Sequence, residues 1–277
     1  MHSILALSLA ALPQDAGPAR HTVTLAEDAT ITLEARWEPV IRWSLGTDEV
    51  VEHPLLTEVA PAEKRREIRG ELLRPFLPPG PVAVGDAWEV DAEAVVPLLA
   101  QLHPGASAEL SRPFQSTPGP HALLRAASDR YLELLTRSHA AFQLDEDVRL
   151  NPAQFEGRLL LERATGRIVA YRLELPARDT NVDVNVRTAG PSKELPFGME
   201  RIDIGFMPRM ELAGGAWPAD LEWSEALEDA EARKRLRARF YGPIDWLPFA
   251  EAVERAHAEH KPLFVVAVFG AFDDESC

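Results

Sequence analysis

The feature that most constrains the fold is a series of short strand-like segments between residues 121 and 212. Valine alternates with polar side chains over residues 182–186, which is typical of a strand with one buried face. Arg163-Ala164-Thr165-Gly166 separates two such segments with a turn sequence, as in a β-hairpin. The segments, in chain order, are 131–144, 155–162, 167–175, 182–186, 199–206 and 207–212. This pattern predicts an antiparallel sheet or sandwich.

The first part of the chain is less regular. Residues 21–25 and 30–37 alternate apolar and polar side chains, so we expect strands there. Residues 62–73 carry basic and acidic side chains in a pattern typical of a helix, which the prolines from Pro75 onward would end. Residues 104–120 are rich in Pro, Ser and Gly, which predicts a long loop.

The character of the sequence changes after Gly215. Ser224 is suited to cap a helix that runs to about Phe240, because its hydroxyl can accept a hydrogen bond from a free backbone N–H. A second helix is expected to begin at Pro248. Residues 263–269 then form a continuous apolar run, which is typical of a strand buried on both faces.

Cysteine occurs once, at Cys277. A single cysteine cannot form an intramolecular disulfide or a cysteine-based zinc site. A helix, a buried strand and a short loop with a cysteine are the opening half of a thioredoxin-like unit, where the next helix stabilises the thiolate. The portion from Pro243 onward has 35 residues, fewer than an independent domain usually needs. We therefore expect the chain to be truncated within this unit.

Several segments in the second half of the chain resemble the selenoprotein N family. Residues 270–277 resemble the segment that leads into that family's Ser-Cys-selenocysteine-Gly motif. The other similar segments, in the family's order, are 142–144, 151–157, 181–184, 199–212 and the helix start at 247–249. The resemblance covers about residues 139 to 277. The EF-hand and membrane anchor of the vertebrate members have no visible counterpart.

The resemblance implies a thiol/selenol-disulfide oxidoreductase whose catalytic pair is Cys277 and a selenocysteine at the next position. The selenocysteine codon is usually read as stop, which would end a translated sequence at Cys277. The selenol would attack a protein disulfide or a small oxidant, and the neighbouring thiol would resolve the mixed species. Without that partner, and beside Asp273, Asp274 and Glu275, we expect Cys277 to be a slow thiol and the chain to be inactive. The alternative is a secreted, non-enzymatic β-rich binding protein with a degenerate thioredoxin-like end.

The predicted fold class is α+β, an antiparallel β-rich domain followed by the N-terminal half of a thioredoxin-like domain. We place the β-rich domain at residues 19–215. The helices and first strand of the truncated thioredoxin-like domain are placed at residues 216–277.

Residues 1–18 are interpreted as a signal peptide. Residues 4–12 are apolar but too few to span a bilayer, and Ser8 and Ala10 fit a small-x-small cleavage site. The protein would then be exported to the periplasm or another extracytoplasmic space. An ordinary buried N-terminus, and with it a cytoplasmic protein, is the alternative, since the segment before residue 4 lacks Lys and Arg.

Composition and missing motifs exclude several classes of function. The net charge is −15, and an acidic surface argues against binding to nucleic acid or to anionic membranes. Like residues 4–12, every other apolar run is too short to span a membrane. The sequence has no P-loop, dinucleotide fingerprint, nucleophile elbow or zincin motif, so we expect no cofactor. The oligomeric state does not follow from the sequence.

Four oxygen-bearing side chains have the spacing of a calcium-binding loop: Asp179, Asn181, Asp183 and Asn185. Val184 and Gly190 occupy the positions where that loop requires Gly and Glu. The alternating valines favour a strand with one polar face, and we expect no calcium site here.

Other polar and aromatic residues have ordinary structural interpretations. His257 and His260 lie three apart on the second helix, but only Cys277 is available as a third ligand, so we expect no metal site. The basic residues 233–239 are interpreted as a solvated helix end. Three tryptophans are expected to pack in the core or between domains: Trp217, Trp223 and Trp246.

Overall fold

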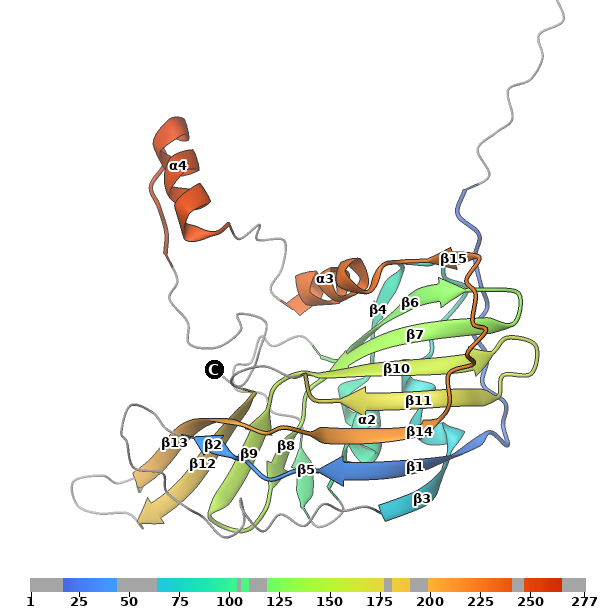
Figure 1. Ribbon diagram of the computed structural model, residues 1–277, viewed down its shortest axis with the longest axis horizontal. Helices are drawn as coiled ribbons and strands as arrows, with labels where there is room; N and C mark the ends of the chain where they lie inside the picture. The colour runs from blue at the N-terminus through green and yellow to red at the C-terminus, as the bar shows by residue number, and fades with distance from the viewer. Residues whose placement is uncertain are drawn as a thin grey trace, which may run out of the picture.

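The computed structural model describes residues 17–43, 64–103, 106–109, 119–176, 181–189, 199–240 and 247–265. Within these residues the chain forms two antiparallel sheets with a few short helices (Figure 1). The observed class is α+β, as predicted, and the sheets carry most of the fold. The described residues do not confirm the predicted thioredoxin-like half.

The larger sheet has the strand order β15-β6-β7-β10-β11-β14-β1-β3, and β4 also pairs with β6. Every pairing in it is antiparallel. Its strands are β1 (Thr30–Trp37), β3 (Lys64–Arg69), β4 (Ala87–Glu89), β6 (His121–Ala127), β7 (Tyr131–Ser138), β10 (Phe155–Glu162), β11 (Ile168–Glu174), β14 (Met210–Gly215) and β15 (Glu225–Ala226).

The smaller sheet has the order β2-β13-β12-β9-β8-β5. Its strands are β2 (Arg42–Trp43), β5 (Ser107–Glu109), β8 (Ala141–Gln143), β9 (Val148–Pro152), β12 (Val182–Ala189) and β13 (Met199–Phe206). Figure 1 shows it beside the end of the larger sheet where β10, β11 and β14 meet it.

Proline marks most of the passages where the chain moves from one sheet to the other. Pro39 lies between β1 and β2, Pro152 ends β9 before β10, Pro176 follows β11, and Pro208 lies between β13 and β14. Proline has no N–H to donate to a strand ladder, so it interrupts pairing at these points. The passage from β7 to β8 uses His139-Ala140 instead.

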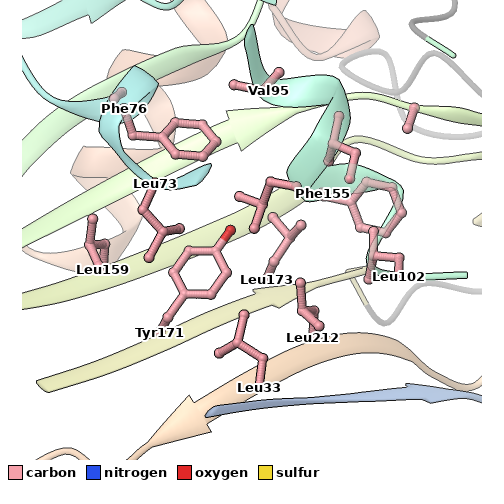
Figure 2. Packing of buried hydrophobic residues seen from close by; sticks show 14 of the residues in the cluster. Leu33, Leu73, Phe76, Val95, Leu102, Phe155, Leu159, Tyr171, Leu173 and Leu212 are labelled. Carbon is pink, nitrogen blue, oxygen red and sulfur yellow. The ribbon is translucent and has the colours of Figure 1, made fainter. Parts of the chain in front are cut away.

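The main core lies against one face of the larger sheet, under α2 (Ala92–Leu99) and the 3-10 helices η1 (Gly70–Leu72) and η2 (Arg74–Phe76). Figure 2 shows Tyr171 and Leu173 of β11 beside Leu73 and Phe76 in this layer. Tyr171 is fully buried, and that burial raises the pKa of its hydroxyl far above the ordinary value. Burying a leucine or phenylalanine side chain contributes roughly 1.5–3 kcal/mol, so this layer dominates the stability.

The opposite face of the larger sheet is covered over β6 and β7 by α3 (Asp229–Phe240). Ala232 and Leu236 of α3 form a second buried cluster with Leu123 and Leu135. β6 and β7 are therefore buried on both faces, and in β7 this burial includes polar residues: Glu133, Thr136, Arg137 and Ser138.

Several predicted elements are confirmed. The hairpin of β10 and β11 closes through Gly166, whose φ of 68° lies in the left-handed region that favours glycine. The predicted strands at 30–37, 182–186, 199–206 and 207–212 correspond to β1, β12, β13 and β14. The helix expected from Pro248 is α4 (Phe249–Glu259), with Pro248 at its N-cap.

Three predictions are wrong. Residues 62–73 are not a helix: β3 and then η1 occupy their described part, because Ile68 and its neighbours pair with β1. Residues 21–25 form only an isolated bridge, between His21 and Val82, although their side chains are alternately buried. Ser224 does not begin a helix, because β15 first pairs with β6 and α3 begins at Asp229.

The predicted loop at 104–120 contains the short strand β5, which pairs with β8. The interpretation of residues 1–18 as a signal peptide falls almost wholly outside the described residues. None of the helices that the structure describes is both long and apolar enough to cross a membrane.

Candidate functional site

The predicted catalytic residue, Cys277, lies outside the described residues, as does the whole of 266–277. The structure describes the segment before it, which consists of α4 and residues 260–265. α4 has no buried residue, and Phe249 on it is 65% exposed. The helix ends at His260, which takes a left-handed conformation with φ of 51°.

The strand expected at 263–269 is not formed over its described part. Leu263, Phe264 and Val265 are irregular, and Phe264 is 81% exposed. The expectation of burial on both faces is therefore wrong for these three residues. A strand of this kind requires neighbouring strands and covering helices, and none of the described elements pairs with it.

The two histidines near this end are both exposed. His257 lies in the last turn of α4 and His260 is its C-cap. Within the described residues, no group of three or more His, Cys, Asp or Glu side chains is arranged to hold a metal ion. The third ligand considered from the sequence, Cys277, lies outside those residues.

A buried charged cluster attaches the C-terminal segment to the sheet. Glu133 of β7 is its centre and is only 1% exposed. Its carboxylate accepts hydrogen bonds from Arg125 Nε and from Trp217 Nε1, the second at 3.2 Å. Arg158 Nη1 of β10 lies 3.7 Å from the same carboxylate. Glu133 thus faces two guanidinium groups, as a buried charge must to offset its lost hydration.

Asp229, the first residue of α3, belongs to the same cluster. It accepts a hydrogen bond from Arg158 Nη2, and its Oδ1 lies 3.2 Å from Arg125 Nη1. Arg125 Nη1 also donates to the backbone oxygen of Leu227 at 3.0 Å. Two arginines on the sheet therefore bind both the approach to α3 and its first turn, where a carboxylate is favoured by the helix dipole.

The electrostatics of the cluster favour the ionised forms of Asp229 and Arg158. Burial opposes ionisation of Asp229, but the hydrogen bond from Arg158 and the charges of Arg158, Arg125 and Arg233 outweigh it and lower the pKa of Asp229. Burial likewise opposes ionisation of Arg158, but the hydrogen bond to Asp229 and the charges of Glu133, Asp229 and Glu156 raise its pKa. The ion pair of Asp229 with Arg158 therefore helps to hold the first turn of α3 against the sheet.

Two of the tryptophans pack against this cluster, as expected from the sequence. Trp217 is partly buried and donates to Glu133. Trp223 is partly buried with the guanidinium carbon of Arg125 5.5 Å from its ring centre, which is within the range of a cation–π contact. Trp246 lies outside the described residues.

A buried polar corner connects the two sheets, and it contains residues of the family-like segments. Asn181 is 1% exposed, and its amide donates to the backbone oxygen of Met207 and accepts from the backbone N–H of Met207, both at 2.8 Å. His139 is 5% exposed, and its Nε2 lies 2.9 Å from the backbone oxygen of Pro152. These side chains hold backbone groups that the prolines leave outside the regular ladders.

The residues with the spacing of a calcium-binding loop lie partly in the same corner and partly on β12. Asn181 binds backbone groups, and Asp183 and Asn185 lie on β12 with ordinary strand pairing to β9 and β13. Asp179 lies outside the described residues. The strand interpretation is therefore confirmed for the described part of this segment.

A polar groove opens on the face of the larger sheet that carries α3. Its volume is about 670 Å³, and α3, β1, β10, β11, β14 and the Pro176 and Pro208 corners contribute to it. Four arginines and three glutamates line it: Arg36, Arg172, Arg209, Arg233, Glu156, Glu174 and Glu211. We call this site the arginine groove. Sequence reasoning missed it because its members are far apart in the chain, and only the strand order brings them together.

Comparison with known proteins gives a consistent result for this α+β, two-sheet chain. It is 27% identical to human selenoprotein N over 321 aligned positions, which cover 90% of the chain and 52% of the human protein. It is 28% identical to mouse selenoprotein N over 320 positions and 27% identical to the zebrafish protein over 318. No family model and no solved structure matches the chain.

These similarities support the family relationship indicated by the sequence motifs: the chain is related to selenoprotein N, and over 90% of its length rather than only the second half. The chain spans about half the length of these curated relatives, between 52% and 56%.

Proposed function

We propose that the protein is a thiol/selenol-disulfide oxidoreductase in which Cys277 acts with a selenocysteine at the next position. The observation that carries the proposal is the similarity to selenoprotein N of three vertebrates across 90% of the chain. The resemblance of residues 270–277 to the segment that leads into the Ser-Cys-selenocysteine-Gly motif supports this role for Cys277. The substrate class is a protein disulfide or a small oxidant.

The proposed reaction on a disulfide has two exchange steps. The selenolate attacks one sulfur, a selenium–sulfur bond forms, and the disulfide bond breaks to release a thiolate that takes up a proton. The Cys277 thiolate then attacks the selenium, a Cys277–selenocysteine bond forms, and the second substrate thiol leaves and is protonated. The substrate has gained two electrons and two protons. A dithiol reductant returns the Cys277–selenocysteine pair to its reduced form.

The thioredoxin-like surroundings of this pair are part of the proposal. Support comes from the described segment before it, where α4 begins at Phe249 and exposes Phe249 and Val253 on one side. Phe264 and Val265 beyond the helix are also exposed. Exposed apolar side chains on a helix and the following segment are expected where further elements of a sheet-and-helix unit cover them.

The test is a disulfide-reduction assay on the protein purified from its natural source or from a selenocysteine-inserting host. We expect reduction of a model disulfide in the presence of a dithiol, and loss of turnover in Cys277→Ser. Ser276→Ala, a matched change one residue earlier, should keep most of the rate. Turnover of Cys277→Ser equal to that of the unaltered protein would exclude Cys277 from the reaction.

The 277-residue chain provides a second, independent check. Its Cys277 lies beside three acidic residues and lacks the selenol, so we expect slow alkylation by iodoacetamide at pH 7. Free glutathione is the reference thiol. A Cys277 that reacts faster than glutathione would contradict this electrostatic reasoning.

A binding role without catalysis is the alternative. The arginine groove favours it, because the described residues form a sheet scaffold with an open charged groove. The two functions differ in the disulfide assay, which a pure binding protein would fail. We also propose that the protein is exported. Sequencing the N-terminus of the mature protein would test this, and a mature chain that still starts at Met1 would contradict it.

A further inference from the structure

The attachment of α3 to the larger sheet combines a small apolar contact with several charged ones. Figure 1 shows the helix lying alongside β6. In the part of α3 whose packing is described, Ala232 and Leu236 are buried, and they form one cluster with Leu123 of β6 and Leu135 of β7. Burial stabilises in proportion to the apolar area removed from water, so this contact depends mainly on the larger side chain, Leu236.

The charged contacts between α3 and the sheet are open to water. Asp229 pairs with Arg158, and these side chains are 42% and 27% exposed. Arg233 Nε donates to Glu156 at 2.7 Å, and these side chains are 39% and 23% exposed. Ion pairs this exposed contribute little to stability, because water solvates the same groups once they separate. Separation of these pairs is therefore a small barrier to movement of α3.

The buried charges beneath α3 stay paired with one another when the helix leaves. Arg125 Nε donates to Glu133, and both side chains are buried in the sheet. Arg158 Nη1 also lies 3.7 Å from the Glu133 carboxylate. The large penalty for breaking a buried ion pair arises when one charge remains buried without its partner. Departure of Asp229 avoids that penalty, because Arg125 and Arg158 still face Glu133.

The chain immediately before α3 is fixed to the sheet by its backbone. The N–H of Ser224 donates to the oxygen of Ala127 at 3.0 Å, and the N–H of Leu227 donates to the oxygen of Arg125 at 2.9 Å. The next helix, α4, has no buried residue. Within the described part of the chain, α3 is therefore the last element with side chains buried against the sheet, and it can swing about Leu227.

We propose that α3 is a releasable strap, which detaches from β6 and β7 as a unit, hinged at Leu227, while the larger sheet stays folded. Release uncovers Leu123 and Leu135 and leaves the segment that contains α4 tethered to the sheet through β15. Such an opening is a sub-global event, which needs less free energy than unfolding of the whole sheet. This inference concerns the movement of α3 and does not rest on the redox proposal.

The experiment compares thiol labelling of two neighbouring buried positions in the Cys277→Ser protein. Leu123→Cys places a thiol under α3, and Leu124→Cys places one in the main core on the other face of β6. With N-ethylmaleimide at pH 7, and after correction for the urea stability of each variant, we expect Leu123→Cys to react at least about tenfold faster. Its rate should rise only weakly with urea, because release exposes little surface, whereas that of Leu124→Cys should rise steeply.

A second pair of variants tests the contact that holds the strap. Asp229→Asn should speed the labelling of Leu123→Cys about fivefold, as expected for the loss of a partly exposed ion pair. Glu228→Gln makes the same change in charge on an exposed residue one position earlier, and it should change the rate less than twofold. An unchanged rate in Asp229→Asn would overturn the proposal.

Hydrogen exchange of the unaltered protein provides a measurement that needs no substitution. The amides of residues 233–237 in α3 should exchange at least about tenfold faster than those of residues 132–135 in β7. Equal exchange in the two segments, or equal labelling of the two cysteines with the same urea dependence, would show that this face opens only when the whole sheet unfolds. Either result would overturn the proposal.

Discussion

Replacing Glu133 by glutamine is predicted to loosen the attachment of α3 to the sheet. The substitution keeps the shape of the side chain but removes the negative charge that Arg125 and Arg158 face. Arg125 is 11% exposed, so little water can replace the lost partner. Hydrogen bonds between charged groups contribute about 1.5–3 kcal/mol, and breaking a buried ion pair costs about 3–5 kcal/mol.

Asp229 remains as a partner of both arginines, so Glu133→Gln should lower the unfolding free energy by an amount near the lower end of these ranges, about 2–3 kcal/mol. The assay is urea unfolding at pH 7, followed by circular dichroism and by tryptophan fluorescence, since Trp217 donates to Glu133. The matched control is Glu174→Gln. The carboxylate of Glu174 is 42% exposed and lies 3.9 Å from Arg172, so its loss should change the unfolding free energy by less than about 0.5 kcal/mol. Equal effects of the two substitutions would refute the reasoning.

Three further predictions concern stability. The pKa of Asp229 is lowered in the folded state, so its contribution to the unfolding free energy is complete above its unfolded pKa of about 4 and is lost as pH falls through the folded pKa. Asp229→Asn should therefore weaken the dependence of the unfolding free energy, measured in urea, on pH between 5 and 2. An unchanged pH dependence would contradict this. Gly214→Ala would place a methyl against the backbone oxygen of Thr32, so thermal unfolding should show a loss of about 1–3 kcal/mol, whereas Gly80→Ala, with open space around it, should be neutral. Gln154 is 2% exposed with no protein partner for its amide, so Gln154→Met should raise urea stability by about 1 kcal/mol; a loss would show that the amide is stabilising.

Local sequence patterns predicted the parts of the fold that depend on neighbours in the chain. The β10–β11 hairpin follows from a turn ending in Gly166 between two apolar segments, and α4 follows from Pro248 and its apolar spacing. The pairing of distant strands was not predictable in this way. Residues 64–69 look helical by their charges, yet they form β3 because β1 supplies a partner and buries Ile68.

The start of α3 and the charged cluster show the same limit. Nothing in the sequence around Ser224 indicates that β15 pairs with β6 before α3 begins. In that pairing Glu225 lies opposite Ala127, which is 98 positions earlier in the chain. Arg125 and Glu133 did offer a signal, because a charged residue between apolar neighbours in a strand must have a buried partner or an outward path. The arginine groove had no such signal, since its residues come from four strands and a helix that only the tertiary fold brings together.

The most direct test of the central proposal is the chemical identity of the residue that follows Cys277 in the protein from its natural source. Tandem mass spectrometry of the peptide that contains Ser276-Cys277, together with the selenium content of the intact protein, measures it. We predict selenocysteine at the position after Cys277 and one selenium atom per chain. A standard amino acid at that position, or a protein free of selenium, would contradict the proposal that Cys277 is half of a cysteine–selenocysteine pair.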